Sequence, residues 1–289
     1  MQAIARTLQL HLRLVRSYPI AALLVAVSFA LVLWTGHSEG RTLHAFGYII
    51  AVWFGAFLTD LIVTLRPRPT VGFPIHHSPI NELAVILICF VLGLVFLFVR
   101  FSPLWPAPST PARIAVAPLL VFAYPIALAL IYLFVFRYRP RELGFNINYW
   151  YLAIVIHVVF GIVTSLVAPD KLHWRSYVQN EGVFGLIMDG IIGAALCEEF
   201  TRMLLMTRLA AVLRNRGLGF VLASYLWAAA HIPSFSGGSA LGIRVQLIHV
   251  WGIVPIGLLW GYLTWRTRSL LPAVLVHGLN LWGLQNGLV

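Results

Sequence analysis

Two adjacent glutamates and an arginine interrupt an apolar segment of the chain between residues 184 and 206. They are Glu198, Glu199 and Arg202. On a helix that turns ~100° per residue, Glu198 and Arg202 lie about 40° apart and Glu199 and Arg202 about 60° apart, so either carboxylate can pair with the guanidinium. The plain structural reading is a buried ion pair that only locks helix packing. The second carboxylate, however, then has no cationic partner within the motif, which makes it a candidate for proton transfer.

Two further segments place imidazoles in apolar surroundings. Trp227 and His231 are four residues apart and share one helical face, and His277 is followed by Asn280 on one face of a later segment. Each of these residues alone is typical of an interhelical hydrogen bond in lipid. Together with the glutamates, they supply the groups that a hydrolytic site needs.

The chemistry of these groups favours the hydrolysis of a peptide bond by an activated water. A glutamate can take a proton from the water while His231 shares or orients it. His277 and Asn280 can then donate hydrogen bonds to the oxyanion that forms. A zinc site built from the two histidines and a glutamate is the alternative. It is less favoured because the chain has no HExxH motif, so no cofactor is expected.

The composition of the rest of the chain is typical of a membrane protein. Of its 289 residues, 60% are hydrophobic and only 10% are charged, whereas soluble domains carry about 25% charged residues. We therefore expect a single integral membrane domain over residues 1–289. The net charge of +11 suits basic loops beside anionic lipid headgroups, and a nucleic-acid partner is not expected.

The expected fold is all-α, a polytopic transmembrane bundle of eight or nine spans. A span needs about 20 apolar helical residues. Nine segments have about this length, of which the seventh and ninth are short enough that eight spans and a re-entrant segment would also fit. The segments are 19–36, 44–65, 82–99, 114–136, 149–168, 184–206, 217–232, 245–263 and 269–286.

The distribution of basic residues supports these spans. The amino-terminal segment and the second, fourth, sixth and eighth loops together hold thirteen of the twenty basic residues, whereas the intervening loops hold six. By the positive-inside rule, the amino terminus is predicted to lie in the cytoplasm, and nine spans would place the carboxyl terminus outside. The predicted location is the cytoplasmic membrane of a bacterium.

The three motifs resemble those of the CPBP family of intramembrane endopeptidases, which includes the CAAX prenyl endopeptidases. That family has a glutamate pair followed by arginine, an FxxxH motif, and a final histidine followed by asparagine. Here these are Glu198 and Glu199 with Arg202, Trp227 with His231, and His277 with Asn280. The resemblance covers about residues 184–286, the predicted catalytic core, whereas residues 1–170 are similar to the family only in being apolar.

This chain departs from the family pattern at two places. The family motif is EExxxR, but here only two residues separate Glu199 from Arg202. In the last motif of the family the asparagine follows the histidine by four positions, but here Asn280 follows His277 by three. The family's catalytic base is the first glutamate. We expect the base to be Glu198, with Arg202 as its ion-pair partner, and keep Glu199 as the alternative.

Other polar residues in the spans have simpler explanations. Asp60 and Asp189 are expected to be structural, and His157 and His249 are lone imidazoles, of which His249 has the better chance of touching the site. His76 and His77 are expected to be solvated. Gly257 and Gly261 form a small-xxx-small pair that permits close helix packing, and the ten Trp and ten Tyr residues suit interface belts.

The predicted function is thus an intramembrane endopeptidase of the glutamic type. The resemblance implies a membrane-tethered peptide or protein substrate, with the bilayer as the other partner. The alternative is a noncatalytic membrane scaffold or immunity protein on the same fold. A transporter that uses Glu and His as a proton relay is less favoured because inverted repeats are not visible.

Overall fold

The computed structural model describes residues 2–100, 123–169, 182–183, 186–232 and 243–279, with side chains except at 96–100, 189, 243–247 and 249. Within these ranges the regular elements are all helical, and there is no strand, which confirms the all-α class. The α-helices are α1 (Gln2–Ser17), α2 (Pro19–Ser38), α3 (Thr42–Leu65), α4 (Pro79–Arg100), α6 (Leu152–Val167), α8 (Cys197–Val212), α9 (Arg216–Ala229), α11 (Ile243–Thr267) and α12 (Leu271–Gly278). There are also two π-helices, η1 (Ile131–Val135) and η4 (Leu186–Leu196), and a 3₁₀-helix, η2 (Pro140–Leu143). Residues 123–130 are α-helical and lead into η1.

Each predicted span coincides with a helix where the structure describes it, but the number of spans remains a prediction. Among the described helices, α2 and α3 are long and apolar enough to cross a membrane by length and composition. The outer faces of α2, α4 and α6 are apolar and exposed, as at Leu23, Ile88 and Leu166. Apolar surfaces of this extent are typical of contact with lipid or a partner.

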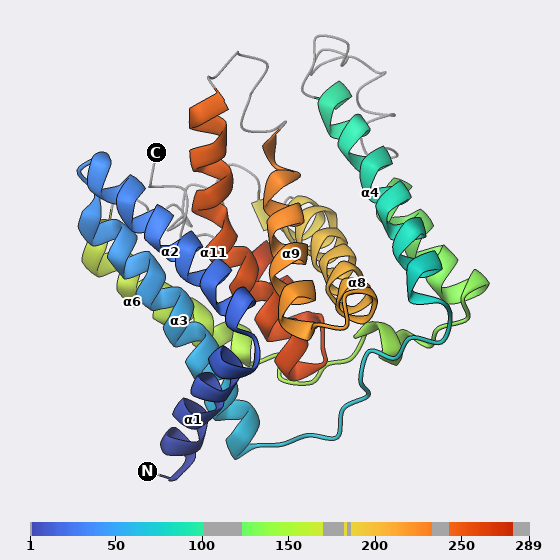
Figure 1. Ribbon diagram of the computed structural model, residues 1–289, viewed down its shortest axis with the longest axis horizontal. Coiled ribbons are helices and arrows are strands. Elements are labelled where there is room, and N and C mark those ends of the chain that lie inside the picture. Colours follow the sequence, from blue (N-terminus) through green and yellow to red (C-terminus); the bar gives the residue numbers. More distant parts are fainter. Residues whose placement is uncertain (1, 101–122, 170–181, 184–185, 233–242, 280–289) are drawn as a thin grey trace.

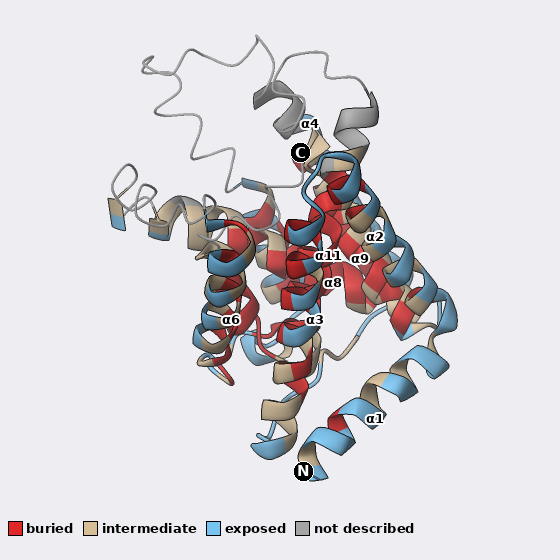
Figure 2. Ribbon diagram, turned by 90° about the vertical axis from the view of Figure 1, so that its left-hand side faces the viewer, coloured by how far each residue is buried: buried red, intermediate tan, exposed pale blue. Residues whose placement is uncertain are grey.

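The core of the molecule is formed by the helices that carry the glutamate and histidine motifs. Figure 1 shows α8, α9 and α11 at the centre, with α2, α3 and α6 on one side and α4 on the other. Buried positions gather in α8, α9 and α11, whereas the outward faces of α2, α3 and α6 are exposed (Figure 2). Helices α8 and α11 are central because most of their side chains are buried, and in α8 these include the charged Glu199, Arg202 and Arg208, which need partners from neighbouring helices.

Helices α8 and α9 form a tight antiparallel hairpin. Asn215 caps α9 because its side chain accepts a hydrogen bond from the backbone N–H of Leu218, at 3.0 Å. At Gly219, a Cβ atom would clash with the backbone of Ala210 on α8. Only glycine permits this approach, which holds the two motif helices in fixed register.

A buried ion pair that sequence reasoning did not single out joins α4 to α8. The Nε of Arg208 donates to Glu82 at 2.7 Å, and the Tyr138 hydroxyl donates to the same carboxylate at 2.6 Å. Both ionised side chains are at most 1% exposed. Arg208 therefore belongs to the protein interior, which corrects the prediction that all basic residues between 207 and 216 lie in the sixth loop.

The predicted basic loops meet at one end of the bundle. The backbone N–H of Arg68 donates to the Tyr149 hydroxyl at 2.9 Å, and the Asn146 amide donates to the carbonyl of Arg268 at 2.7 Å. Three loops that are far apart in sequence are thus tied together. Burial lowers the pKa of Arg268, and the positive charges of Arg216 and Arg266 lower it further, so the sixth and eighth loops also lie close.

The Glu82–Arg208 pair is expected to contribute strongly to stability. Arg208→Met leaves the Glu82 carboxylate buried without its cation, which typically costs about 3–5 kcal/mol. The expected result is a fall in Tm on the order of 10 °C for the purified protein in detergent, measured by differential scanning fluorimetry.

Arg214→Met is the matched control, because Arg214 is exposed in the turn after α8, and it should leave the Tm nearly unchanged. The double variant Glu82→Gln/Arg208→Met should recover part of the loss. An Arg208→Met protein as stable as the control would contradict the importance of this pair.

Candidate active site

The two glutamates lie where a π-helix passes into an α-helix. Helix η4 ends at Leu196 and α8 begins at Cys197, whose thiol donates to the carbonyl of Ile192, five residues earlier, at 3.2 Å. Wide π-turns inside longer helices are frequent at functional sites because they change which side chains face a neighbour. Here the change comes directly before Glu198 and Glu199.

Glu199, not Glu198, forms the ion pair with Arg202. Nη1 of Arg202 donates to Oε1 of Glu199, and each side chain is 1% exposed. The expectation that the i+4 spacing would give Glu198 the ion pair is therefore wrong. Glu199 points into the bundle, and its partner also lies 4.3 Å from the centre of the Trp227 ring, where a cation–π contact stabilises it.

Glu198 is the carboxylate left without an arginine, and it faces two imidazoles. Its Oε2 accepts a hydrogen bond from Nε1 of Trp227. Nε2 of His231 lies 3.9 Å from this oxygen and Nε2 of His277 lies 3.7 Å from it. The Glu198 side chain is 26% exposed, so a reactant can reach the carboxylate.

Both imidazoles are held through their Nδ1 atoms. Nδ1 of His277 lies 2.9 Å from Oε1 of Glu199, and Nδ1 of His231 lies 3.0 Å from the carbonyl of Trp227. Both partners are acceptors, so the hydrogen-bond network assigns the proton of each neutral ring to Nδ1. The Nε2 atoms of both rings then have lone pairs on the side where Glu198 lies.

A tryptophan that sequence reasoning missed supports His277. The ring of Trp260, on α11, stacks on the imidazole with centroids 3.7 Å apart and planes at 13°. Trp260 also packs edge-on against Trp227, with centroids 5.4 Å apart. Trp260 could have been found from its spacing. It lies three residues after Gly257 and next to Gly261, so all three share one face of α11.

Glycines bring the supporting helices close enough for these contacts. A Cβ atom at Gly257 would lie 2.6 Å from the Trp227 ring, and one at Gly278 would lie 2.7 Å from the backbone of Ile191. The first glycine lets α11 approach α9, and the second lets α12 cross η4. The histidine of α12 thus reaches the glutamates that follow η4.

The structure brings together six of the seven predicted site residues: Glu198, Glu199, Arg202, Trp227, His231 and His277. The seventh, Asn280, lies outside the described residues, as do the side chains of Asp189 and His249. Asp60 is buried in a separate cluster with His11, Tyr262 and Arg266.

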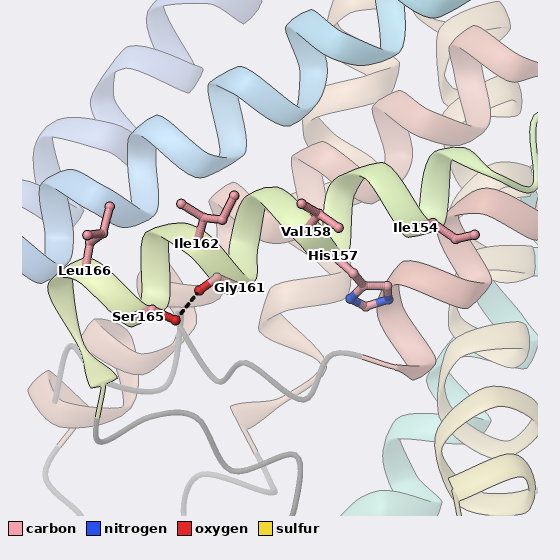
Figure 3. A pocket seen from close by; sticks show the side chains of 7 residues that line it. All are labelled: Ile154, His157, Val158, Gly161, Ile162, Ser165 and Leu166. Carbon is pink, nitrogen blue, oxygen red and sulfur yellow. Dashed lines mark hydrogen bonds between the residues drawn. The ribbon is translucent and has the colours of Figure 1, made fainter.

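Three other histidines that the structure describes, His76, His77 and His157, have partners outside this cluster. Nε2 of His157 lies 3.3 Å from the carbonyl of Leu275. His76 is exposed and pairs with Glu142, and the ring of His77 contacts the carbonyl of Phe136 at 2.9 Å. Figure 3 shows His157 with Ser165 in a cavity of about 610 Å³ along the outer side of α6. The lining of that cavity is almost entirely apolar, and it includes none of the six clustered residues.

The predicted zinc alternative needs the two histidines and a glutamate as ligands. In the part of the chain that the structure describes, no group of three or more His, Cys, Asp or Glu side chains has the arrangement of a metal site. Oε1 of Glu199 is already engaged by Arg202 and His277. Zinc bound by the two histidines and a glutamate stays the alternative prediction.

Comparison with known families agrees with the motifs. Residues 180–282 match the model of the Rce1-like type II CAAX prenyl endopeptidases. The predicted resemblance to the CPBP family is confirmed. This Rce1-like segment contains all seven predicted site residues, and the family implies a membrane-embedded protease. No curated protein and no solved structure matches the chain.

The close approach at Gly257 should control the position of Trp227 in the Rce1-like segment. Gly257→Ala places a methyl group against the indole ring and is expected to weaken its hydrogen bond to Glu198. In ¹⁵N–¹H spectra of the ten indole groups, the Trp227 signal should move.

Gly261→Ala is the matched control on the same helix, since its Cβ would meet the edge of Phe220 at 3.3 Å and the Arg202 side chain at an ordinary contact distance of 3.5 Å, and not Trp227. It should leave the Trp227 signal in place. If both variants shift that signal equally, the proposed contact does not determine the position of the indole.

Proposed function

We propose that this protein is an intramembrane endopeptidase of the glutamic type, in which Glu198 activates water for attack on a peptide bond. The observation that supports this most is the position of one carboxylate, held by Trp227, opposite the Nε2 atoms of His231 and His277. A carboxylate without a cationic partner in α8 can accept a proton more readily than one that is paired with arginine.

The attacking water can be held by two acceptors. Oε2 of Glu198 and Nε2 of His231 are 3.9 Å apart, so one water at ~2.8 Å from each can donate a hydrogen bond to both. Its lone pairs then point away from these acceptors and toward a substrate carbonyl. As the oxygen attacks the carbonyl carbon, the water's proton passes to Glu198.

Collapse of the tetrahedral intermediate completes the hydrolysis. The oxyanion needs hydrogen-bond donors, and we assign this role to His277 and Asn280. His277 donates from Nε2 in its imidazolium form, while Nδ1–H still donates to Glu199. That second proton is taken from bulk water before the substrate binds and stays on the ring throughout the reaction. The carbonyl re-forms, the C–N bond breaks, and protonated Glu198 returns its proton to the departing amine nitrogen. The products are a carboxylic acid and an amine.

Glu199, Arg202 and Trp260 are best interpreted as positioning residues. Glu199 holds Nδ1 of His277 and is itself held by Arg202. Trp260 fixes the plane of the same imidazole by stacking. In other catalytic arrays, a third residue orients the histidine in the same way. His277 then presents one defined nitrogen to the reaction.

The substrate that suits this site is a peptide segment tethered to the membrane. The apolar outer helices and the buried site favour a substrate that arrives from the bilayer. A prenylated carboxyl-terminal tail is the specific substrate class suggested by the family description. The basic loops at one end of the bundle favour a cytoplasmic amino terminus and a place in the bacterial inner membrane.

Replacing the proposed base should abolish hydrolysis. Glu198→Gln keeps the size of the side chain but removes the proton acceptor, so kcat should fall about 10³-fold, within the range for general-base catalysis. Glu199→Gln should cost roughly 10- to 100-fold because it acts through His277. The measurement is mass spectrometry of products from a farnesylated peptide and from its unprenylated, acylated counterpart, in vesicles.

Glu39→Gln is the control, since Glu39 is exposed at the end of α2, and it should retain full activity. If Glu198→Gln and Glu199→Gln fold normally and both cleave at the wild-type rate, the hydrolytic proposal is wrong. A wild-type protein that cleaves neither peptide would favour the noncatalytic scaffold.

A glutamic mechanism also predicts independence from metal ions. Hydrolysis by the purified protein should be unchanged after treatment with 1,10-phenanthroline or EDTA, and metal analysis should find less than one zinc per chain. Loss of activity with the chelator and its recovery on adding zinc would instead establish the zinc mechanism.

A further inference from the structure

Helix α1 has three distinct faces along its 16 residues. One face is turned toward the protein, where Thr7 is fully buried and His11 is half-buried. A second face exposes large apolar side chains, and a third exposes arginines. The sequence predicts this segment only as a basic flank of the first span, so the helix is a finding of the structure.

The orientation of α1 is fixed by a polar contact with the bundle. Nε2 of His11 lies 2.8 Å from Oδ2 of Asp60, whose side chain is fully buried on α3. Tyr262 and Arg266 of α11 donate to the same carboxylate. Because His11 is held in this way, α1 cannot turn its apolar face toward the protein without breaking the contact.

The exposed apolar face is a continuous stripe. Ile4, Leu8, Leu12 and Val15 recur at helical spacing, and each is between 44% and 58% exposed. At ~100° per residue, the four side chains fall within about 80° of arc. We call these four residues the apolar stripe. A soluble surface rarely presents four large aliphatic side chains in one row, so the stripe indicates a partner.

The charge beside the stripe indicates what that partner is. Arg6, Arg13 and Arg16 are exposed and lie on a face centred roughly 130° from the centre of the stripe. A helix with aliphatic residues on one face and arginines on the next is the pattern of an interfacial helix that binds anionic lipid. The aliphatic face enters the acyl boundary, and the guanidinium groups stay with the phosphates.

The connection to α2 agrees with this position. The chain changes direction at Tyr18, which has φ −134° and ψ 62° and separates α1 from α2, the apolar helix that begins at Pro19. Figure 2 shows α1 running obliquely to α2, set apart from the core helices. A helix that leaves a candidate span at an angle is placed to lie along the membrane surface.

We propose that α1 is a surface helix that docks in the plane of an anionic bilayer, with the apolar stripe in the acyl boundary and Arg6, Arg13 and Arg16 against lipid phosphates. This inference requires that the chain lies in a membrane, but it does not require peptide hydrolysis. It also gives His11 and Asp60 a role, because they aim the stripe at the lipid.

Spin labels on the full-length protein test the proposed orientation. In a Cys89→Ser/Cys197→Ser background, a nitroxide is placed at Leu12→Cys on the stripe or at Gln9→Cys on the polar face. The protein is reconstituted in vesicles of phosphatidylcholine with one quarter phosphatidylglycerol. Collisions with a water-soluble nickel complex should be several-fold rarer at position 12 than at position 9, and collisions with oxygen should be more frequent.

The role of the arginines is tested with the same labels. In vesicles of phosphatidylcholine alone, or in the variant Arg6→Gln/Arg13→Gln/Arg16→Gln, the difference between positions 12 and 9 should shrink at least twofold. An unchanged difference would contradict recognition of anionic lipid.

Two other results would overturn the docking proposal. Equal nickel access at both positions would mean that the stripe faces water, and dipolar broadening between labels at position 12 would mean that it pairs with a second copy of the chain. Because the labels report depth and not catalysis, failure here leaves the peptidase proposal untouched, and an inactive protein leaves this test valid.

Discussion

A carboxylate and a guanidinium lie side by side inside α8 with almost no access to solvent. Burying two charges costs several kcal/mol per ion, and their attraction offsets that cost only when the geometry is good and further partners are present. Besides the ion pair, Glu199 contacts His277, and the Arg202 guanidinium lies over the rings of Trp227 and Trp260. The ion pair therefore constrains four helices at once, because a shift of any one of them would leave a charge uncompensated.

This constraint leaves the neighbouring carboxylate available for chemistry. With Glu199 committed to Arg202 and His277, adjacent Glu198 projects toward the indole N–H of Trp227 and the two imidazoles. The two glutamates differ in environment, since one is 1% exposed and the other 26%. Groups of one type in different environments commonly divide the tasks of a site between them. In the proposed mechanism, one carboxylate orients a histidine and the other moves the proton.

The all-α class could be predicted because long apolar segments are visible along the chain, whereas the number of spans stays a prediction. The pairing of Arg202 could not, since helical spacing puts both glutamates within its reach and only the packing of α12 selects Glu199. Trp260 could not be singled out because it is one of ten tryptophans, and tryptophan is common at membrane interfaces. Helix α1 was missed because its arginines dominated the interpretation of its residues, although Leu8, Leu12 and Val15 already had helical spacing.

A pair of double-mutant cycles tests most directly which of the two glutamates pairs with Arg202. The free energy of unfolding is determined for Arg202→Met combined with Glu199→Gln and, separately, with Glu198→Gln. A coupling energy of at least about 1 kcal/mol is expected for the buried Glu199 pair and close to zero for the Glu198 pair. Strong coupling of Arg202 to Glu198, with none to Glu199, would contradict the account.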